Sequence, residues 1–344
     1  MISVLSSRNT TADLLKGLAV LFMIQVHIME QFASKELQGT VIGKISMFLG
    51  GPACAPVFLA VMGYFLVSNE KPFIYYFKRG CLLFAGGIAL NIARSANLLI
   101  QINRGQFNLD PLSFIFGADI LTLAGISLLL IGLIRLIFKS SFYPWILLAL
   151  FIAAVTPYLP AFPGRDTPFA YLMAFFYGIF DWSYFPVFPW FSYVLAGYAA
   201  RLMADKPGLL VQVKTGTSLF YLIPAGAGLL YTLPWAASIF TSLNGINSYY
   251  HHGFLFFLWV IVFLFIYIAG TSIANYSFGT NRIVLIIRWI GQKVTLIYVI
   301  QWLIIGNLAT IFFGTQNLLH VLLWIPAVIL VTFFGAKLFS RIFP

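Results

Sequence analysis

The sequence predicts an all-α membrane protein, a polytopic bundle of about ten transmembrane helices, from three observations. Hydrophobic residues make up 61% of the 344 residues, whereas charged residues make up only 8%. A soluble domain carries about 25% charged residues because its surface faces water. Continuous apolar runs of about 20 residues, the length that an α-helix needs to cross a bilayer, recur along the chain. Because these runs do not alternate with polar residues, they favour helices over the strands of a membrane β-barrel.

Ten apolar runs are long enough to be predicted as spans. They cover residues 14–33, 46–67, 75–95, 117–138, 143–160, 185–203, 218–240, 253–274, 289–312 and 319–340. The fifth is the shortest, because Pro157 and Pro160 limit its helix. The first lacks the small-residue cleavage site of a signal peptide, so we expect it to stay as an anchor. No connection is long enough for a soluble domain, and residues 1–344 are expected to form a single transmembrane domain.

Basic residues are distributed unevenly between alternate loops. With the N-terminus inside, the inner side receives fifteen: Arg8, Lys16, Lys71, Lys78, Arg79, Arg135, Lys139, Arg201, Lys206, Lys214, Arg282, Arg288, Lys293, Lys337 and Arg341. The outer side receives five: Lys35, Lys44, Arg94, Arg104 and Arg165. Lys and Arg concentrate in cytoplasmic loops. We therefore predict that both termini are cytoplasmic, and that the net charge of +11 reflects topology and not binding to nucleic acid.

The two cysteines and the longer loops add little chemistry. Cys54 and Cys81 both lie in apolar runs and are expected to be packed thiols. No spacing of Cys and His resembles a zinc site, so no metal is predicted. The segments 96–116 and 161–184 are rich in apolar and aromatic residues and are expected to be interfacial or re-entrant elements on the outer side.

The first span contains the best candidate for a catalytic group. Its sequence from Lys16 onward is KGLAVLFMIQVH, which places His27 about 16 Å along the helix from Lys16, at or beyond the middle of the membrane. Glu30 follows three residues later, on the same helical face. A neutral imidazole at that depth can accept a proton, and a carboxylate beside it could fix its tautomer. The alternative is a histidine that only packs against a neighbouring helix.

Most other polar groups near the spans fall in the outer half of the predicted membrane. They are Asn91, Arg94, Asp119, Asp181, His251, His252, Gln301 and Asn307. Ionisable residues inside a membrane are costly and mark functional sites by default. Their common depth predicts an outward-facing polar cavity that binds substrate. For Arg94 and Asp119, an ion pair that ties two helices is an equally good interpretation.

Several segments together resemble bacterial membrane acyltransferase family three. That family has a first-helix pattern like LDxLRGLAxLLVVxxH, which this sequence matches at Asp13, Gly17, Leu18, Ala19 and His27, with Lys16 in place of Arg. The stretches APVFLAVMGYFLV, RGCLLFAGGIALN and DILTLAGISLLL resemble the second, third and fourth helices of the superfamily. FPWFSYVLAGY and IGQKVTLIYVIQW resemble its late patterns, with Gln301 where many members have His. The resemblance covers most of the chain in order.

The related heparan-α-glucosaminide N-acetyltransferase-like group shares several of these segments. Its functional His lies in the loop after the first helix, and residues 31–50 of this chain contain no His. That assignment therefore does not carry over. Lys16 also lacks the bidentate geometry of the usual Arg.

The resemblance implies a membrane-embedded acyltransferase in the bacterial inner membrane. Acetyl-CoA or another acyl-CoA would arrive from the inner side, where Lys16, Lys78 and Arg79 suit its phosphates. A hydroxyl or amine of an envelope glycan or lipid-linked sugar would arrive from the outer side, with His27 as general base. An acyl-His intermediate remains open.

Two further classes remain open. The first is a proton-coupled transporter or a lipid or glycan flippase that uses His27, Glu30, Asp119 and Asp181 as a relay. Such proteins often contain inverted repeats or broken helices, and the sequence shows neither. The second is an assembly subunit of an envelope complex, which would not need an intramembrane His.

Overall fold

The computed structural model describes residues 8–67, 71–138, 141–160, 167–204, 215–241 and 246–342. These residues form helices and connecting turns, with two isolated β-bridges between neighbouring segments. The structure therefore confirms the predicted all-α fold. Four basic residues of the loop count lie outside the described residues: Lys139, Arg165, Lys206 and Lys214.

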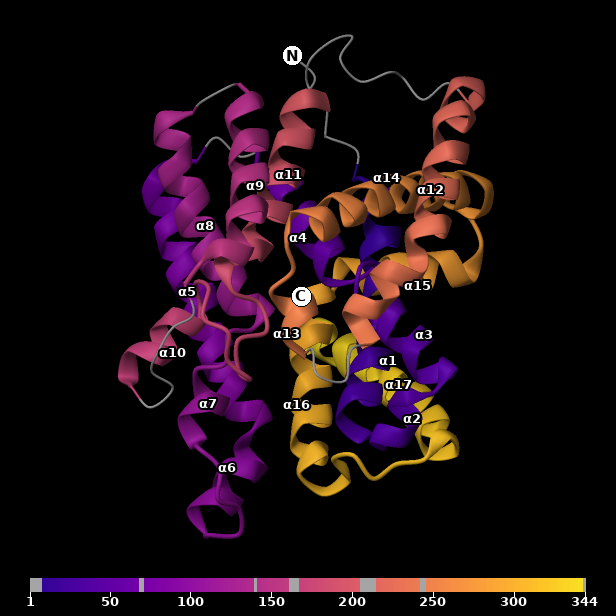
Figure 1. The fold of residues 1–344 in the computed structure, drawn as a ribbon. Helices are drawn as coiled ribbons and strands as arrows, with labels where there is room; N and C mark the ends of the chain where they lie inside the picture. The colour runs from indigo at the N-terminus through magenta and orange to yellow at the C-terminus, as the bar shows by residue number, and fades with distance from the viewer. Residues whose placement is uncertain are drawn as a thin grey trace.

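In the described residues a helix lies at each of the ten predicted spans (Figure 1). These helices are α1 (Thr10–Phe32), α4 (Ala55–Leu66), α5 (Phe73–Arg94), α8 (Ile120–Ile137), α9 (Tyr143–Val155), α11 (Val187–Ala204), α12 (Thr215–Thr241), α14 (Phe254–Phe278), α16 (Val294–Phe312) and α17 (Leu318–Ile342). Eight spans are long and apolar enough to cross a membrane. One of the eight combines α4 with the helix before it, as Val41–Leu66. The chain is an integral membrane protein.

The two helices outside that set are α9 and α11. Helix α9 has only 13 residues and continues into the short 3-10 helix η1 (Thr156–Tyr158), where Pro157 interrupts the α-helical pattern. Helix α11 has 18 residues, but its backbone is not helical at Phe188, just before Pro189.

The shorter helices connect or extend the spans. They are α2 (Lys35–Gly39), α3 (Val41–Gly50), α6 (Ala96–Asn103), α7 (Pro111–Ile115), α10 (Pro168–Ala174), α13 (Ile246–Tyr250) and α15 (Arg282–Gln292). Two predicted spans are broken by them. The span 46–67 divides into α3 and α4 at Gly51 and Pro52, since proline cannot continue a helix. The span 289–312 begins inside α15, and the helix is interrupted at Lys293 before α16 starts.

Three pairs of helices cross so closely that a glycine on each helix faces the backbone of the other. The pairs are Gly17 and Gly291 for α1 and α15, Gly63 and Gly197 for α4 and α11, and Gly80 and Gly125 for α5 and α8. A Cβ atom at Gly197, for example, would lie 1.9 Å from the carbonyl oxygen of Ala60. The absence of side chains at these positions lets the helices pack backbone to backbone.

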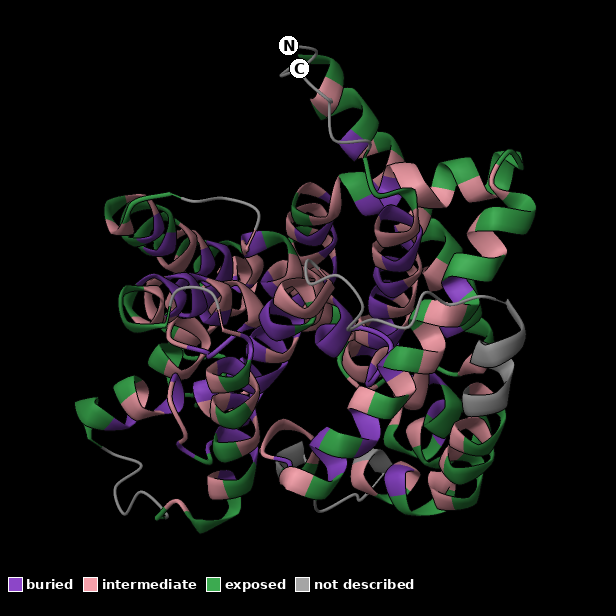
Figure 2. Ribbon diagram, turned by 90° about the horizontal axis from the view of Figure 1, so that it is seen from above, coloured by how far each residue is buried: buried purple, intermediate pink, exposed green. Residues whose placement is uncertain are grey.

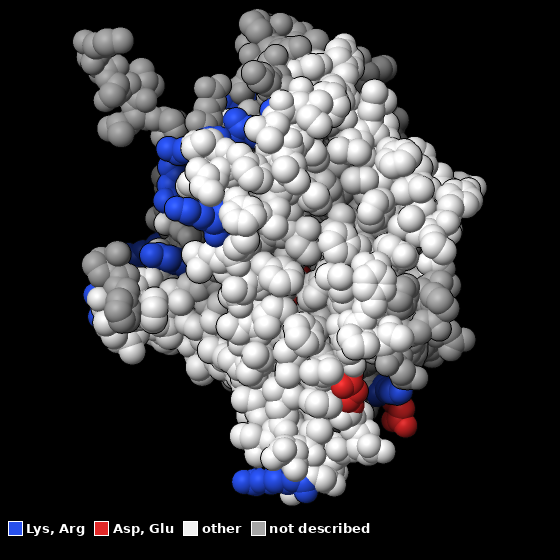
Figure 3. All heavy atoms as spheres, turned by 90° about the vertical axis from the view of Figure 1, so that its left-hand side faces the viewer, with Lys and Arg blue, Asp and Glu red and all other residues white. Residues whose placement is uncertain are grey.

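The buried side chains form two main clusters. One gathers mainly α4, α5, α8, α9, α11 and α14, with Leu15 and Ala19 of α1. The other gathers mainly α1, α16 and α17, with Leu90 of α5. In Figure 1, α5, α8 and α9 stand on the left and α1, α16 and α17 stand in the centre and on the right. Figure 2 shows the buried residues turned toward the interior and the exposed ones toward the outside. The face in Figure 3 carries charged residues in separate groups toward its two ends, with a broad uncharged surface between them, as expected for a surface that faces lipid.

Helix α16 contacts the end of α5 through hydrogen bonds and close backbone packing, and so connects the two groups of helices. The amide Nδ2 of Asn307 donates to the carbonyl of Ala93 at 2.9 Å, and its Oδ1 accepts from the backbone N–H of Asn97 at 3.0 Å. Gly306 lies so close that a Cβ would be 2.5 Å from the carbonyl oxygen of Arg94. This contact fixes Arg94 beside α16.

Candidate active site

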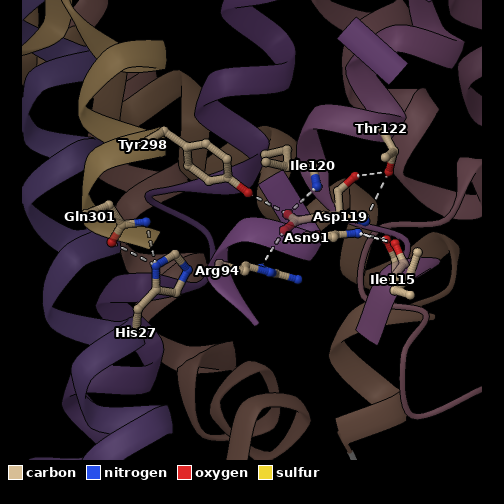
Figure 4. Close-up of polar contacts among 10 residues, drawn as sticks. His27, Asn91, Arg94, Ile115, Asp119, Ile120, Thr122, Tyr298 and Gln301 are labelled. Atoms are coloured by element: carbon tan, nitrogen blue, oxygen red, sulfur yellow. Dashed lines mark hydrogen bonds and ion pairs between the residues drawn. The ribbon is translucent and has the colours of Figure 1, made fainter. Parts of the chain in front are cut away.

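His27 on α1 is held by two consecutive residues of α16, Gln301 and Trp302. Figure 4 shows the contact with Gln301. The side-chain amide of Gln301 lies across Nδ1 of His27, with Oε1 at 3.2 Å and Nε2 at 3.1 Å. The imidazole also packs on the indole of Trp302, with ring centroids 4.2 Å apart. Gln301 is fully buried, whereas His27 is only half-buried. Both groups are therefore ordered by the fold, and part of the imidazole stays accessible.

Arg94 and Asp119 form the predicted ion pair next to this histidine. Nη1 of Arg94 lies 2.7 Å from Oδ2 of Asp119, and the two side chains are only 12% and 7% exposed. The guanidinium carbon of Arg94 is 4.4 Å from the ring centroid of Trp302, a cation–π distance. Trp302 therefore contacts both His27 and Arg94.

Three groups fix the carboxylate of Asp119. The hydroxyl of Tyr298 and the backbone N–H of Ile120 each donate to Oδ1 at 2.6 Å. Asp119 also forms the N-cap of α8 in a reciprocal capping box with Thr122. Tyr298 lies one helical turn before Gln301 on α16, so a single face of α16 orders both His27 and Asp119.

Replacing Asp119 by asparagine is expected to destabilise the protein by about 3 kcal/mol, because it leaves the buried charge of Arg94 without its partner. The asparagine keeps the shape and the helix cap, so the charge alone changes. SDS-induced unfolding of the purified protein in detergent measures the difference. The control Asp110→Asn removes an exposed carboxylate and should cost no more than about 1 kcal/mol. Unfolding of Asp119→Asn at the wild-type SDS fraction would show that the ion pair does not stabilise the fold.

Glu30 does not pair with His27 among the described residues, although the two lie on one face of α1. It interacts electrostatically with Cys54 and with the hydroxyls of Tyr184, Tyr249 and Tyr250. Gln301 takes the place that the sequence predicted for Glu30 as the partner of His27. The i, i+3 spacing aligned the two side chains along α1, but the imidazole turns toward α16 instead.

The hydroxyl of Tyr184 lies within electrostatic range of several of the predicted site residues. It interacts electrostatically with Arg94, Glu30, Asp119 and Asp181. Tyr184 lies in the loop before α11, outside the spans, and burial raises the pKa of its phenol. The phenol therefore stays protonated and can donate a hydrogen bond. Sequence reasoning missed it because an aromatic residue in an interfacial loop is ordinarily a membrane anchor.

A polar cavity of about 170 Å³ lies against the Arg94–Asp119 pair. It is lined by Arg94, Ser95, Ser113, Phe114, Gly117, Asp181, Trp182 and Tyr184. The loop that contains Trp182 is fixed to the start of α8, since Ala118 donates to the carbonyl of Trp182 and accepts from the N–H of Phe185, both at 2.8 Å. Of the residues predicted for a polar cavity, Arg94 and Asp181 line this one, and Asp119 lies against Arg94.

The two histidines before α14 lie in different surroundings. In His252, Nδ1–H donates to the carbonyl of Tyr249 at 2.7 Å and Nε2 accepts from the hydroxyl of Tyr193 at 2.8 Å. Burial lowers its pKa to about 3, so it is neutral and both nitrogens are used within the fold. In His251, burial lowers the pKa to about 4, and a backbone hydrogen bond ties it to Ser183, in the loop of the cavity. Its Nε2 is buried and has no hydrogen-bond partner among the described residues.

The predicted donor-binding residues lie on two helices, α1 and α5. Lys16 pairs with Asp13 at 3.1 Å on α1. Lys78 and Arg79 belong to α5. These two lie exposed at the start of α5, where Arg79 donates to the hydroxyl of Tyr75 at 2.8 Å. Within the described part of the chain, no group of three or more His, Cys, Asp or Glu residues is placed to hold a metal ion.

Replacing Gln301 by leucine is expected to lower kcat about 10-fold to 100-fold, because the imidazole loses the group that orients it. The leucine keeps the buried volume and removes the amide. The measurement is the initial rate of the acetyl transfer that the sequence resemblance implies, at saturating substrate. Gln101→Leu, which removes an amide from α6, is the matched control and should stay within about twofold. Wild-type kcat in Gln301→Leu would exclude an orienting role for the amide.

The fold is that of an integral membrane protein, and the family comparison supplies the reaction class. Residues 8–221 match the family model described as heparan-alpha-glucosaminide N-acetyltransferase, catalytic. The match covers more than half of the chain, so the protein belongs to that family of transmembrane acyltransferases. No curated protein and no solved structure shows significant similarity to the chain. The resemblance to membrane acyltransferases is confirmed, through the group related to family three, and the protein is of the membrane acetyltransferase type.

Proposed function

We propose that the protein transfers an acetyl group from acetyl-CoA to a hydroxyl or amine of an extracytoplasmic glycan or lipid-linked sugar. The observation that carries this proposal is the position of His27, which is held by Gln301 and lies beside the Arg94–Asp119 pair. The acetyltransferase family supports the reaction class. The proposed location is the bacterial inner membrane, with both termini in the cytoplasm.

The proposed general base is Nε2 of His27. If Nδ1–H donates to Oε1 of Gln301, Nε2 keeps its lone pair and can accept a proton. It removes a proton from the acceptor hydroxyl or amine as that atom attacks the thioester carbonyl. The new C–O or C–N bond forms, the C–S bond breaks, and the coenzyme A thiolate takes the proton back from His27.

The charged groups around the cavity would stabilise this reaction. Arg94 and the phenol of Tyr184 both line the cavity, and they can donate to the oxyanion that develops on the thioester carbonyl. Asp119 positions Arg94, and Asp181 is proposed to bind the acceptor. Glu30 is proposed to balance charge in the same region, near Tyr184.

The remaining predicted residues receive proposed roles at the two ends of the path. Lys16, Lys78 and Arg79 are proposed to bind the phosphates of the CoA donor at the inner side. His251 is proposed to contact the acceptor, since its Nε2 is buried beside the cavity loop without a partner among the described residues. His252 is proposed to order the same region through Tyr193 and Tyr249.

The test is incubation of the purified protein in lipid nanodiscs with [14C]acetyl-CoA and an envelope extract that contains glycans and lipid-linked sugars. We expect label to appear in the glycan or lipid fraction, with one free coenzyme A thiol per acetyl group transferred. If acetyl-CoA is neither bound nor consumed, the proposed reaction is wrong. Proton movement across proteoliposomes without acetyl-CoA would instead support a proton-coupled transporter.

A further inference from the structure

The short helices beside the polar cavity expose an apolar surface. We call this surface the apolar rim, and it consists of Ile100, Phe107, Leu109, Leu112, Phe169 and Leu172. Each of these side chains is between 39% and 52% exposed. They belong to α6, to α7, to α10 and to the turn that joins α6 and α7, which lie together at the lower left of Figure 1. None of these helices is long enough to cross a membrane.

The rim segments carry almost no charge. In residues 96–118 and 167–180 the charged residues are Arg104 and Asp110. The carboxylate of Asp110 caps α7 and accepts from the hydroxyl of Tyr171 at 2.6 Å. A segment that faces water would carry about a quarter charged residues. Exposed apolar side chains with so few charges are typical of a surface that lies in the membrane interface.

The same short elements line the cavity on their other side. Ser113 and Phe114 of α7 line it directly, and α6 begins after Ser95, which also lines it. Helix α10 reaches it through Tyr171, whose ring stacks on Trp182 with centroids 5.4 Å apart. These segments therefore contribute Ser95, Ser113 and Phe114 to the cavity and expose apolar side chains on their outer surface.

The apolar rim continues the lipid-facing surface of a span. Helix α5 ends at Arg94 and α6 begins at Ala96, with only Ser95 between them. Ile92 near the end of α5 is 44% exposed, and Ile100 on α6 is 52% exposed. Because α5 is a membrane-spanning helix, lipid that covers its outer surface also reaches the rim.

We propose that the acceptor is a membrane lipid with a sugar head, and that its tail stays in the bilayer against the apolar rim while its head enters the cavity. This inference rests on the proposed function and narrows the acceptor class. A cavity of about 170 Å³ is smaller than the roughly 300–1,000 Å³ typical of pockets for drug-sized ligands. It therefore suits one small polar head, and the rim supplies the additional binding energy through the tail.

The first experiment compares two acceptors that share one head. Protein in nanodiscs receives [14C]acetyl-CoA with either dodecyl β-glucosaminide or free glucosamine, which offer the same amine and hydroxyls. We expect kcat/KM to be at least about tenfold higher for the dodecyl compound. The triple variant Leu112→Gln, Phe169→Gln, Leu172→Gln should lose this preference and leave the rate with free glucosamine unchanged. The control Leu112→Ile, Phe169→Leu, Leu172→Ile keeps the rim apolar and should keep the preference.

Equal kcat/KM for the two acceptors would overturn the proposal and would support a soluble glycan as acceptor. The same holds if the glutamine variant slows both acceptors equally. If neither acceptor is acetylated while acetyl groups reach a water-soluble glycan of the envelope extract, the lipid acceptor is again excluded.

A second measurement does not depend on activity. A nitroxide at Phe169→Cys, in a Cys54→Ala and Cys81→Ala background, reports whether the rim lies in lipid. We expect it to collide with dissolved oxygen and to be shielded from a water-soluble nickel complex, in contrast to a nitroxide at the exposed Glu36→Cys. Nickel accessibility equal to that of the control would overturn the lipid-facing rim. A shielded label in a protein that transfers no acetyl group at all would contradict the proposed function and leave the rim's position in lipid supported.

Discussion

Replacing His27 by alanine is expected to lower kcat for acetyl transfer by about 10² to 10⁴, the usual contribution of a general base. The imidazole is the proposed proton acceptor, and the surrounding residues offer no substitute in the same position. Gln301 cannot accept a proton at neutral pH, and Arg94 is already protonated and paired with Asp119. The measurement is the release of free coenzyme A thiol and the transfer of label from [14C]acetyl-CoA.

The matched control is His320→Ala, which removes an exposed histidine from α17. This variant should keep the wild-type kcat. The alanine at position 27 must also leave the protein monodisperse in detergent, with an SDS unfolding midpoint near that of the wild type. A folded His27→Ala protein with wild-type turnover would remove His27 from the mechanism.

The second large effect is expected from Gly197→Ala, which should destabilise the protein by about 3 kcal/mol or more. The added Cβ would lie 1.9 Å from the carbonyl oxygen of Ala60, so α4 and α11 would have to separate. Because Gly63 on α4 faces α11 in the same way, both sides of the crossing would lose their contact. SDS-induced unfolding in detergent measures the change.

The control for this effect is Gly86→Ala on α5, where a Cβ would meet no atom within 4 Å. Both glycines lie inside helices, so alanine improves helix propensity equally in the two variants, by about 1 kcal/mol. Gly86→Ala should therefore be neutral or stabilising. Equal unfolding midpoints for the two variants would contradict the close crossing of α4 and α11.

The positions of the spans could be predicted from the sequence, because the bilayer imposes their length and their low charge on the chain itself. Gly51 and Pro52 are residues that break helices, but the apolar run continues across them, so the sequence predicted one span where the structure has α3 and α4. The interruption at Lys293 could not be predicted in the same way, because the residue there is neither proline nor glycine. Helix boundaries of this kind depend on packing between helices.

The candidate site could be predicted only in part. The sequence predicted that Arg94, Asp119 and Gln301 lie at a similar depth in the membrane. The structure places all three near His27. Which side chains touch depends on how the helices rotate, and one sequence does not contain that information. For this reason the sequence placed Glu30 beside His27, whereas the structure places Gln301 against its Nδ1.

Other contributors were invisible because their residue types are common in membrane proteins. Trp302 and Tyr298 are two aromatic residues among many in an apolar span, and only their contacts with Arg94 and Asp119 distinguish them. The spacing of Tyr298 and Gln301, three residues apart, would have placed both on one face of the helix. Tyr184 had no sequence signal, since its importance comes from a loop that folds back onto the start of α8.

The most direct test of the account is the sidedness of acetyl transfer in sealed proteoliposomes of known protein orientation. [14C]acetyl-CoA is supplied on one side only, and dodecyl β-glucosaminide together with the envelope extract is supplied on the other. We expect labelled acceptor when acetyl-CoA faces the end that bears Lys78 and Arg79 and the acceptor faces the end that bears Arg104, and no label in the reverse arrangement. His27→Ala in the productive arrangement should give none. Transfer only when donor and acceptor share one side, or equal transfer by the His27→Ala protein, would contradict transfer across the membrane through His27.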